Sequence, residues 1–435
     1  MPPLDRDGRV AIVGTMTAGA LTLALLLAAI CVLWIAASGL GLRVLRAVPV
    51  LSRLPIAPPG RDGDGPLLAI LVPACDEARD AAAVADLRAA HASRLVAAST
   101  LAAASGRPVE ILYIDDRSTD ATGAILDEFA AAAAAAPVAV RSLHLRELPE
   151  GWLGKTHALQ RGLDASRGEW VLLSDADVRL APEALVRALG HGEAQGLDHL
   201  TLMPQLDRGG WLRDATLAAF GRLFCLELAA VNDPRSRASV GVGAFNLARR
   251  AALERIGGLR PVRLEVADDM LLARTLRRSG ARQGVASGRD LVTLAWYRTA
   301  LGIVRGLDKG LFAYGGRCEP WRLFAVALLF VALELGPWVA LVWGAARAAS
   351  TAWPWLALAL LGGAALLSGH LVVALGERWM GRRSGPVLLL AAGGLIMCWG
   401  MLRAGWMGWR RGGVLWRGTL YPSALLRAAM APRDR

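Results

Sequence analysis

The segment WVLLSDADVRL, residues 170–180, carries the sharpest chemical signal in the sequence, because an apolar run leads directly into Asp175 and Asp177. Alternate residues of an extended chain point to the same side, so the two carboxylates are expected to face one direction. Such a pair can hold one hard divalent cation, Mg²⁺ or Mn²⁺, and leave other coordination positions to water and diphosphate oxygens. A DxD pattern alone is common in solvated turns. Its place at the end of a predicted strand is what favours a metal site.

Two further acidic clusters follow predicted strands. Glu77 comes after LLAILVP, the apolar run that ends at Pro73, and Asp115 and Asp116 close the next run, VEILYID. Carboxylates accept hydrogen bonds from ribose hydroxyls and from a base N–H, so both clusters suit a nucleoside. The alternative is that the second cluster only turns the chain and caps a helix that starts at Thr119.

A glycine-containing segment, LPEGWLGKTHAL (residues 148–159), lies between the third and fourth predicted strands. Gly151 and Gly154 allow close backbone approach, and Lys155 opens a helix whose amino end can help it to contact a phosphate. The spacing is not that of a Walker loop. His157 next to it is more typical of a packed helix residue than of a ligand.

Two later segments complete the set. SVGVGAFNLARR (residues 239–250) is expected to carry Gly241, Gly243 and Phe245 on a strand that packs its backbone around a sugar. EVADDMLLARTLRRSG (residues 265–280) starts a helix at Asp268 and Asp269. Carboxylates at a helix start can serve as caps that the helix dipole favours. In the functional interpretation, one of them is a general base that removes the proton from a hydroxyl attacking an anomeric carbon.

The elements that position these residues alternate between strand and helix from residue 67 onwards. LLAILVP and VEILYID are strand-like, an alanine-rich stretch between them is helix-like, and VAVRSLHL (residues 138–145) gives a third strand. Such alternation predicts an α/β fold with a mostly parallel, doubly wound, Rossmann-like sheet. Ligands of these sheets bind beyond the carboxyl ends of the strands, where the acidic clusters lie.

The chain has 435 residues, of which 54% are hydrophobic, and this is high for a purely soluble protein. The stretch between Arg9 and Arg43 is uncharged and long enough to span a bilayer, whereas the apolar core of a cleaved signal peptide has only about 7 to 15 residues. Three more apolar runs occupy residues 323–346, 353–375 and 386–402. We therefore predict an anchor at 1–45, a linker at 46–66, a catalytic domain at 67–287, an interfacial segment at 288–322, transmembrane helices at 323–409 and a basic tail at 410–435.

The formal net charge of +12 is better explained by anionic lipid headgroups than by nucleic acid, because the arginines lie near the ends of the apolar runs. Arg43, Arg46 and Arg53 follow the first run, so the positive-inside rule places the central domain in the cytoplasm of a multi-pass inner-membrane protein. The five cysteines show neither metal-site nor disulfide spacing. Three C-terminal spans would leave the arginine-rich tail outside, against the same rule. Either one of the apolar runs is a re-entrant or interfacial segment, or the tail lies on the side of the membrane that the positive-inside rule disfavours.

The motifs VPACDEA, IDDRSTD, GWLGKTHAL, SDAD, VGVGAFNLARR and ADDMLLA occur in this order. The order resembles that of family 2 inverting glycosyltransferases with the GT-A fold, over residues 67–309. Two later segments, WYRTALGIVRGLDKGLFA and WRGTLYP, resemble the membrane-bound branch that includes hopanoid-associated and carotenoid glycosyltransferases.

The resemblance implies a role for each matching residue. Glu77 and Asp116 become nucleoside contacts supported by Asp115, and Asp269 becomes the base, next to Asp268. Asp175 and Asp177 become the metal and diphosphate group. The remaining residues predicted to bind the nucleotide sugar are Pro73, Lys155 and Gly243. Two departures stand out, because the first motif more often has Asn in place of Asp76, and RCEPW has Pro320 where many relatives carry the arginine of QxxRW.

Together these features predict an inverting glycosyltransferase that needs a divalent metal. Its donor would be a nucleotide-diphospho-sugar, usually a UDP-sugar in such relatives, and its acceptor the hydroxyl of a lipid or isoprenoid-type molecule at the cytoplasmic membrane face. A processive polysaccharide synthase is one alternative, which the few spans and the altered QxxRW disfavour. A catalytically silent sugar-nucleotide-binding membrane protein is the other, although binding alone would not require a base.

Overall fold

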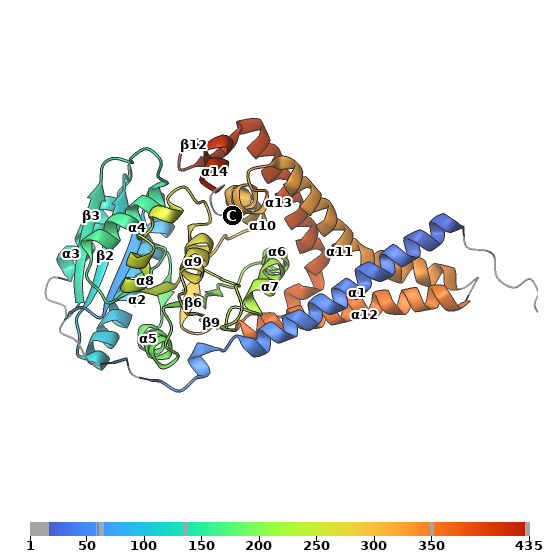
Figure 1. The fold of residues 1–435 in the computed structure, drawn as a ribbon, viewed down its shortest axis with the longest axis horizontal. Coiled ribbons are helices and arrows are strands. Elements are labelled where there is room, and N and C mark those ends of the chain that lie inside the picture. Colours follow the sequence, from blue (N-terminus) through green and yellow to red (C-terminus); the bar gives the residue numbers. More distant parts are fainter. Residues whose placement is uncertain (1–16, 58, 61–64, 134–137, 349–351, 431–435) are drawn as a thin grey trace, which may run out of the picture.

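The structure is a computed structural model that describes residues 17–57, 59–60, 65–133, 138–348 and 352–430. An α/β domain stands at one end of the molecule, and long apolar helices extend from it (Figure 1). The first ten residues of the predicted anchor, together with Ala11 to Met16, lie outside the described part.

A seven-stranded sheet with the order β3-β2-β1-β4-β8-β6-β9 forms the centre of the α/β domain. Its strands are β1 (Leu68–Ala74), β2 (Val109–Asp116), β3 (Val138–Leu145), β4 (Trp170–Leu173), β6 (His199–Met203), β8 (Asn246–Arg249) and β9 (Gln283–Ser287). β1 to β4 are parallel, whereas β8 is antiparallel to both β4 and β6. Every residue of β1, β2 and β4 is buried, as expected for strands covered on both faces. The predicted mostly parallel sheet is confirmed.

A second, three-stranded sheet joins β5 (Arg179–Leu180), β10 (Val292–Leu294) and β7 (Gln205–Leu206). β10 pairs antiparallel with β5 and parallel with β7. β5 follows the DxD segment along the chain, so this small sheet holds the C-terminal end of that segment in place.

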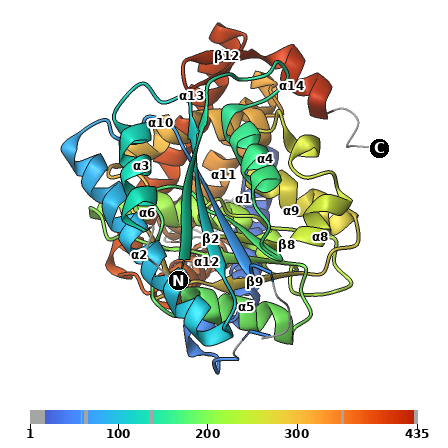
Figure 2. The same ribbon diagram turned by 90° about the vertical axis from the view of Figure 1, so that its left-hand side faces the viewer.

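Helices cover both faces of the central sheet (Figure 2). One apolar core lies against α2 (Ala81–Ser105), α3 (Thr122–Ala132) and α5 (Ala184–Ala194). Another lies against α4 (Gly154–Ala165), α8 (Arg250–Arg255) and α9 (Asp268–Arg278). The ends of α2 follow ordinary capping chemistry, because the Asp80 carboxylate accepts the N–H of Ala83 and Gly106 takes the left-handed conformation after the last turn.

The helix predicted from Thr119 begins three residues later, at Thr122. The reason is competition from side chains for the backbone N–H groups. The Asp76 carboxylate accepts the Thr119 N–H at 2.7 Å, and the Asp120 carboxylate accepts the N–H groups of Ala78 and Thr122. These bonds tie the loop after β2 to the loop after β1, on the edge where the acidic clusters meet.

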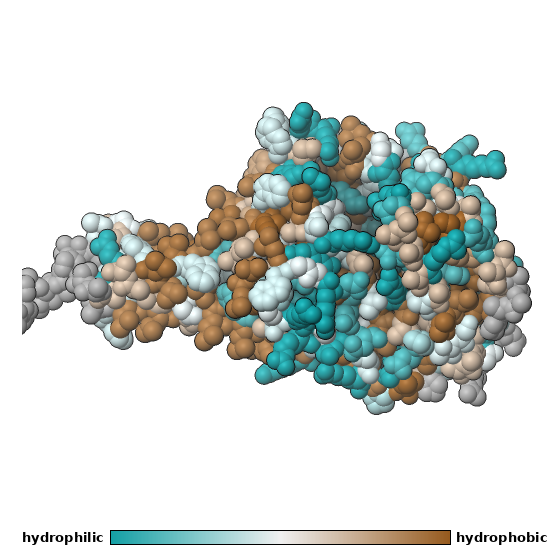
Figure 3. All heavy atoms as spheres, turned by 180° about the vertical axis from the view of Figure 1, so that it is seen from behind, coloured by the Kyte–Doolittle hydropathy of each residue, from teal (hydrophilic) through white to brown (hydrophobic). Residues whose placement is uncertain are grey.

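Four helices are long and apolar enough to cross a membrane, one N-terminal and three C-terminal, as predicted. They are α1 (Ala18–Ala47), α11 (Pro320–Ala348), α12 (Ala352–Trp379) and the segment Gly385–Arg411, in which a 3₁₀ turn (Gly385–Leu389) precedes α13 (Leu390–Arg411). Glycines allow α1, α11 and α12 to pack closely. A Cβ at Gly344 would lie 2.6 Å from the Ala359 nitrogen, and one at Gly41 would lie 2.6 Å from Val372. Apolar side chains cover the outside of this stalk (Figure 3).

α13 runs across α1 and α12 rather than along them (Figure 1). Its near end packs on α6 (Trp211–Gly221), since a Cβ at Gly393 would meet the backbone of Ala215. Its far end packs on the turn after α10 (Ala300–Gly310), since a Cβ at Gly408 would meet Phe312. One end of α13 therefore lies against the α/β domain, and the other lies against the turn that follows α10.

The chain continues from α13 into a hairpin and a short helix. The hairpin consists of β11 (Gly413–Trp416) and β12 (Thr419–Pro422), and α14 (Ser423–Met430) follows it. The hairpin places the tail beside the carboxyl ends of the parallel strands.

One further short helix, α7 (Cys225–Leu228), lies between α6 and β8 along the chain.

Candidate active site

The reversed strand β8 explains why segments from both halves of the domain meet at one edge. Because β8 is antiparallel to β4, its first residue Asn246 pairs with Leu173, the last residue of β4. Just before β8, the carbonyl of Gly243 accepts the N–H of Asp175 at 3.0 Å. The amino end of β8 and the carboxyl ends of β1, β2 and β4 thus form one edge.

A small cavity at this edge has a wall built largely from residues that the sequence predicts. They are Pro73, Lys155, Asp175, Gly243, Asp268 and Asp269. A wider hollow of about 950 Å³, open solvent included, is lined by Glu77, Ala176 and Asp177, so the DxD segment contributes to both hollows. The structure therefore brings the predicted donor, metal and base residues together on one side of the domain.

Lys155 is the central cation of the small cavity. Its Nζ lies 2.8 Å from Asp175 Oδ1 and 3.7 Å from Asp268 Oδ2. Burial alone would lower the pKa of Lys155, but the carboxylates of Asp175 and Asp268 outweigh burial and raise it. In turn, burial would raise the pKa of Asp175, and Lys155 more than offsets this, so that the pKa is lowered. Both groups therefore stay ionised at neutral pH.

Asp269 is held by two backbone donors. One of its oxygens accepts the N–H of Gly243 and the other accepts the N–H of Met270, each at 2.8 Å. Burial raises the pKa of Asp269. Burial also raises the pKa of Asp268, to about 6; repulsion from Asp269 and Asp175 adds to this effect, and Lys155 opposes it. Asp269 remains partly open to the cavity whereas Asp268 is buried. A fixed carboxylate with a raised pKa has the properties of a general base.

The predicted strand through Gly241 and Gly243 is wrong, since β8 begins only at Asn246. The backbone before it bonds to the site instead of to a neighbouring strand. Gly243 donates to the Asp269 carboxylate and accepts from Asp175. A Cβ at Gly241 would lie 2.0 Å from the Asp269 carbonyl oxygen, so only glycine allows this turn to rest on the start of α9.

The DxD segment is a turn rather than the extended chain that the sequence suggests. β4 ends at Leu173, and Asp175 and Asp177 line different hollows. Asp177 reaches solvent at the rim of the wider hollow. Desolvation by the surrounding protein is the first cause that raises the pKa of Asp177, and repulsion from Asp175 and Glu77 adds to it; the pKa reaches about 7.

The side chain of Arg94, on α2, fixes the conformation of this turn. Its side chain is fully buried and donates from Nη2 to the carbonyls of Asp175 at 3.1 Å and Val178 at 3.2 Å. Its Nη1 donates to the hydroxyl of Tyr113 at 3.0 Å. The turn thus bonds to a guanidinium instead of to a neighbouring strand, which explains why the extended conformation is absent.

We expect Arg94→Met to lower the free energy of unfolding by about 2 to 3 kcal/mol, because buried carbonyls lose a charged donor. Denaturant unfolding of the detergent-solubilised protein measures this change. The matched control is Arg88→Met on the same helix, where Arg88 makes an exposed ion pair with Glu128. That variant should lose less than about 1 kcal/mol. Equal losses in the two variants would contradict a role for Arg94 in holding the turn.

The residues present fit a divalent cation that is shared with a diphosphate. Among the described residues, no three His, Cys, Asp or Glu side chains gather as a metal-binding group. Mg²⁺ and Mn²⁺ sites of phosphate-handling enzymes, however, commonly use one or two carboxylates together with substrate oxygens. Burial is the first cause of the raised pKa of Asp177, and repulsion from Asp175 and Glu77 adds to it; a cation would relieve that repulsion. Asp175 and Asp177 would hold the ion.

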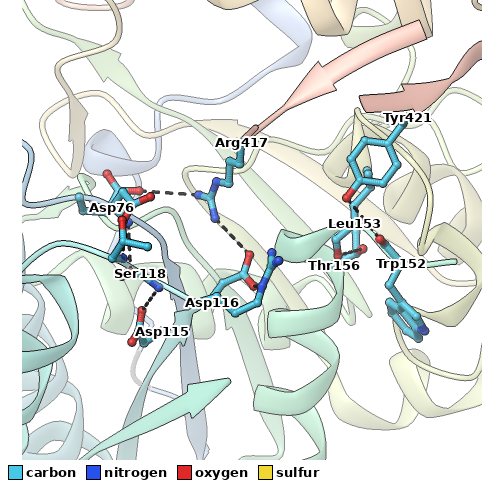
Figure 4. A network of polar contacts seen from close by, with 12 residues as sticks. Asp76, Asp115, Asp116, Ser118, Trp152, Leu153, Thr156, Arg417 and Tyr421 are labelled. Carbon is cyan, nitrogen blue, oxygen red and sulfur yellow. Dashed lines mark hydrogen bonds and ion pairs between the residues drawn. The ribbon is translucent and has the colours of Figure 1, made fainter. Parts of the chain in front are cut away.

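A side chain from the C-terminal tail, Arg417, reaches Asp116 (Figure 4). The Arg417 guanidinium lies 3.4 Å from the carboxylate of Asp116 and 3.8 Å from that of Glu77. Asp116 is fully buried and also pairs with Arg117 at 2.9 Å. Burial raises the pKa of Glu77 although Arg417 opposes this effect. The two predicted nucleoside contacts are therefore adjacent, and a third residue bridges them.

Asp115 turns to the other face of β2, as alternation along a strand requires. Its carboxylate pairs with His144 at 3.0 Å and accepts the N–H of Ser118 at 3.1 Å. It shapes the loop after β2, and its predicted role in nucleotide-sugar binding stays a prediction.

Sequence reasoning missed three cations at this edge: Arg94, Lys309 and Arg417. Arg94 and Lys309 sit on helices whose patterns are ordinary, and Arg417 lies in the segment that we interpreted only as a basic tail. One signal was present in the sequence, because Lys155 and Lys309 are its only lysines among 49 basic residues. Both of them act electrostatically on Asp175.

Residues 71–257 match the model of the family described as Glycosyl transferase family 2. None of the curated proteins matches the chain.

Several solved structures are similar to the chain. One is the mannosyltransferase PcManGT from Pyrobaculum calidifontis in complex with GDP-Man and Mn²⁺, with 21% identity and a TM-score of 0.48, covering 85% of this chain and 98% of that one. Another is S. aureus TarS 1–349 in complex with UDP-GlcNAc, with 15% identity and a TM-score of 0.37, covering 81% and 95%. A third is mannosyl-3-phosphoglycerate synthase from Rubrobacter xylanophilus, with 17% identity and a TM-score of 0.38, covering 62% and 83%.

The family match covers the strands that end at the acidic clusters, the DxD turn and the turn before β8. The mostly parallel sheet with its one reversed central strand has the layout of a GT-A domain. The α/β domain therefore has the GT-A fold, residues 71–257 of it match glycosyl transferase family 2, and the chain is a glycosyltransferase.

Proposed function

We propose that the chain transfers a sugar from a nucleotide-diphospho-sugar to the hydroxyl of a lipid at the cytoplasmic face of the inner membrane, with inversion at the anomeric carbon. The observation that carries this proposal is the small cavity in which Lys155, Asp175 and Asp269 share one wall. Such a wall offers a phosphate-binding cation, a metal-binding carboxylate and a base within the space of one sugar diphosphate.

The donor would lie along the strand ends, with its nucleoside at Glu77 and Asp116 and its diphosphate toward Asp175. Carboxylates accept the N–H of the base and the ribose hydroxyls. Relatives of this type usually take UDP-sugars, and UDP is therefore the first nucleotide to test. A divalent cation bound at Asp175 and Asp177 would neutralise charge on the leaving nucleoside diphosphate.

Asp269 would remove the proton of the attacking hydroxyl. The N–H groups of Gly243 and Met270 hold its two oxygens in place, and Asp268 beside it stays engaged with Lys155. One base and one in-line displacement are sufficient for inversion, so no covalent nucleophile is required.

An aromatic row leads from the cavity toward the apolar helices and supports a lipid acceptor. Tyr297 faces the site, since burial and then the carboxylates of Asp175 and Asp177 raise its pKa to about 12. Its ring contacts Trp296 at 4.9 Å between centroids, and Trp296 contacts Phe220 at 5.5 Å. Aromatic side chains of this kind suit the boundary between membrane and water. We propose that the acceptor hydroxyl approaches along this row.

The position of α13 offers an answer to the conflict over the tail. One of its ends packs on α6 and the other on the turn after α10. Its outward side carries side chains that are exposed at helical spacing: Leu395, Trp399, Leu402, Trp406 and Trp409. Such a stripe is typical of a helix that lies in the membrane interface. We propose that α13 lies there rather than crossing, so that only α1, α11 and α12 span the bilayer and the basic tail stays in the cytoplasm with Arg43, Arg46 and Arg53.

Reporter fusions test this topology. A periplasm-active reporter at residue 350, between α11 and α12, should be active, whereas the same reporter after residue 435 should be inactive. A fluorescent protein that matures only in the cytoplasm should give the opposite pattern. Activity of the periplasmic reporter at residue 435 would refute the interfacial position of α13.

Transfer itself is tested with purified protein, UDP-sugars, Mn²⁺ and a membrane lipid extract. Release of UDP together with a new glycolipid would support the proposal. A growing polymer would favour the polysaccharide synthase. Measurable UDP binding without release of UDP from any donor would favour the silent sugar-nucleotide-binding protein. Comparing the lipids of cells with and without the gene would then name the sugar and the acceptor.

A further inference from the structure

Two cations reach the candidate site from outside the region that matches the family. Lys309 lies near the end of α10, and Arg417 lies at the tip of the hairpin β11–β12. The family match ends at residue 257, so the common features of that domain do not account for either residue.

The hairpin tip is held firmly above the strand ends. Arg417 and Gly418 both have positive φ, of 46° and 78°, which is the conformation of a tight two-residue turn between paired strands. The Lys309 ammonium lies 3.9 Å from the centroid of the Trp416 ring. On the other strand, the hydroxyl of Tyr421 donates to the carbonyl of Trp152 at 3.5 Å (Figure 4). Trp152 precedes α4, the helix that carries Lys155. The tail is thus docked on the site rather than free in solvent.

The two cations differ from Lys155 in how strongly they are engaged. Lys155 pairs with Asp175 at 2.8 Å, whereas Arg417 stands 3.4 Å and 3.8 Å from its two carboxylates. Within the described part of the chain, no carboxylate lies within ion-pair distance of Lys309, whose side chain has exposed surface although protein surrounds its ammonium group. Lys309 and Arg417 therefore have positive charge that remains available to an incoming anion.

Their position fits the diphosphate of a donor. Arg417 acts electrostatically on Glu77 at the nucleoside end and on Asp175 at the diphosphate end, and Lys309 also acts on Asp175. A nucleotide sugar brings at least two negative charges to an edge that is already crowded with carboxylates. Cations that are not locked in close ion pairs are needed to offset that charge.

We propose that Lys309 and Arg417 bind the diphosphate of the nucleotide donor, which makes the C-terminal hairpin a part of the donor site. This inference rests on the proposed transfer from a nucleotide-diphospho-sugar. In the free protein Arg417 bridges Asp116 and Glu77. When the nucleoside supplies hydrogen-bond donors to these carboxylates, the guanidinium turns to the phosphate oxygens, where it can bind in a bidentate manner.

Calorimetry in detergent with Mn²⁺ tests the proposal, using UDP and GDP as diphosphates and UMP and GMP as the matched monophosphates. Lys309→Met and Arg417→Ala should each weaken diphosphate binding by about tenfold to a hundredfold, as expected for the loss of a charged hydrogen bond. Monophosphate binding should weaken much less. Arg417→Lys should recover part of the affinity, and Arg410→Ala, an exposed arginine at the end of α13, should bind as the unaltered protein does.

The outcomes separate this proposal from the one on which it rests. If the unaltered protein binds neither diphosphate, the proposed function fails and the role of both cations fails with it. If it binds UDP or GDP and both variants keep the same affinity, only the role of the cations is refuted. An equal loss of affinity for monophosphates and diphosphates would show that the hairpin has only a structural role. Tighter diphosphate binding by Arg417→Ala would show that Arg417 blocks the donor site. Thermal unfolding of each variant confirms that it is folded.

The pH dependence of binding gives an independent check. Surrounding protein, and then repulsion from Lys155 and Arg417, lowers the pKa of Lys309 to about 8, although Asp175 and Asp268 act in the opposite direction. Lysine loses its charge as the pH rises through its pKa. The affinity for UDP should therefore fall as the pH rises above about 8, and Lys309→Met should remove this decline. An unchanged decline in that variant would exclude Lys309 as its source.

Discussion

Asp269→Asn is expected to abolish most sugar transfer while the donor still binds. A general base contributes about 10² to 10⁴ in rate, and an amide cannot take the proton of the acceptor hydroxyl. Asparagine keeps one oxygen that can accept the N–H of Gly243, so the turn before β8 should remain in place. Single-turnover transfer with a saturating donor measures the rate, and calorimetry with UDP and Mn²⁺ measures binding, which should change by less than about threefold.

The control for this variant is Asp290→Asn, which alters an exposed carboxylate in the loop after β9. It should transfer sugar at the normal rate. Unchanged turnover in Asp269→Asn would remove Asp269 from the role of base, and Asp268→Asn would then be the variant to measure. A matching loss of UDP affinity in Asp269→Asn would mean that the carboxylate supports the donor site instead.

The second large effect is expected for Asp177→Ala, which should remove most of the gain in UDP affinity that Mn²⁺ provides. Within the described residues Asp177 has no cation at ion-pair distance, and repulsion from Asp175 and Glu77 contributes to its raised pKa. A divalent cation is the simplest partner for this charge. We expect UDP binding in the presence of Mn²⁺ to weaken about tenfold or more, a loss of about 1.4 kcal/mol or more. In the absence of metal the affinity should hardly change.

Asp86→Ala is the matched control, because Asp86 lines the same wide hollow but is already paired with Arg179 at 2.6 Å and Arg298 at 3.1 Å. Its metal response should equal that of the unaltered protein. If Mn²⁺ strengthens UDP binding equally in Asp177→Ala and in the unaltered protein, the cation is held elsewhere.

The sheet and the apolar helices could be predicted because their signals are local. Continuous apolar runs such as Leu68–Ala74 and Trp170–Leu173 are buried on both faces, and the strand ends then place Glu77, Asp116 and Asp175 on one edge without further information. The start of α9 was predictable for the same reason, since Asp268 and Asp269 precede a helical apolar pattern.

Turns proved harder to predict, because their conformation depends on partners far away in the sequence. Alternation suggests that Asp175 and Asp177 point the same way, but Arg94 on another helix bonds to the carbonyls between β4 and β5 and bends the chain. Likewise, Asp76 holds the N–H of Thr119 and delays the start of α3. Neither effect leaves a periodic signal.

The position of Arg417 was the hardest feature of the site to predict from the sequence. It lies 301 residues beyond Asp116, and the contact exists only because α13 turns back onto α6 and α10. Treating 386–402 as an ordinary span sends the tail away from the domain. A helix that is apolar enough to span and a helix that lies flat with glycines on its inner side look alike in composition, and the distinction requires the partners of Gly393 and Gly408.

The place of the hairpin in the chain gives the protein an order of assembly. Its residues 413–422 follow all four apolar helices and are therefore translated after them. Until the ribosome has passed this point and the preceding helices have inserted, Arg417 cannot reach Asp116. A nascent chain would thus carry a folded sheet that lacks the Arg417 contacts to Asp116 and Glu77, and this edge would be complete only after the apolar helices have been made.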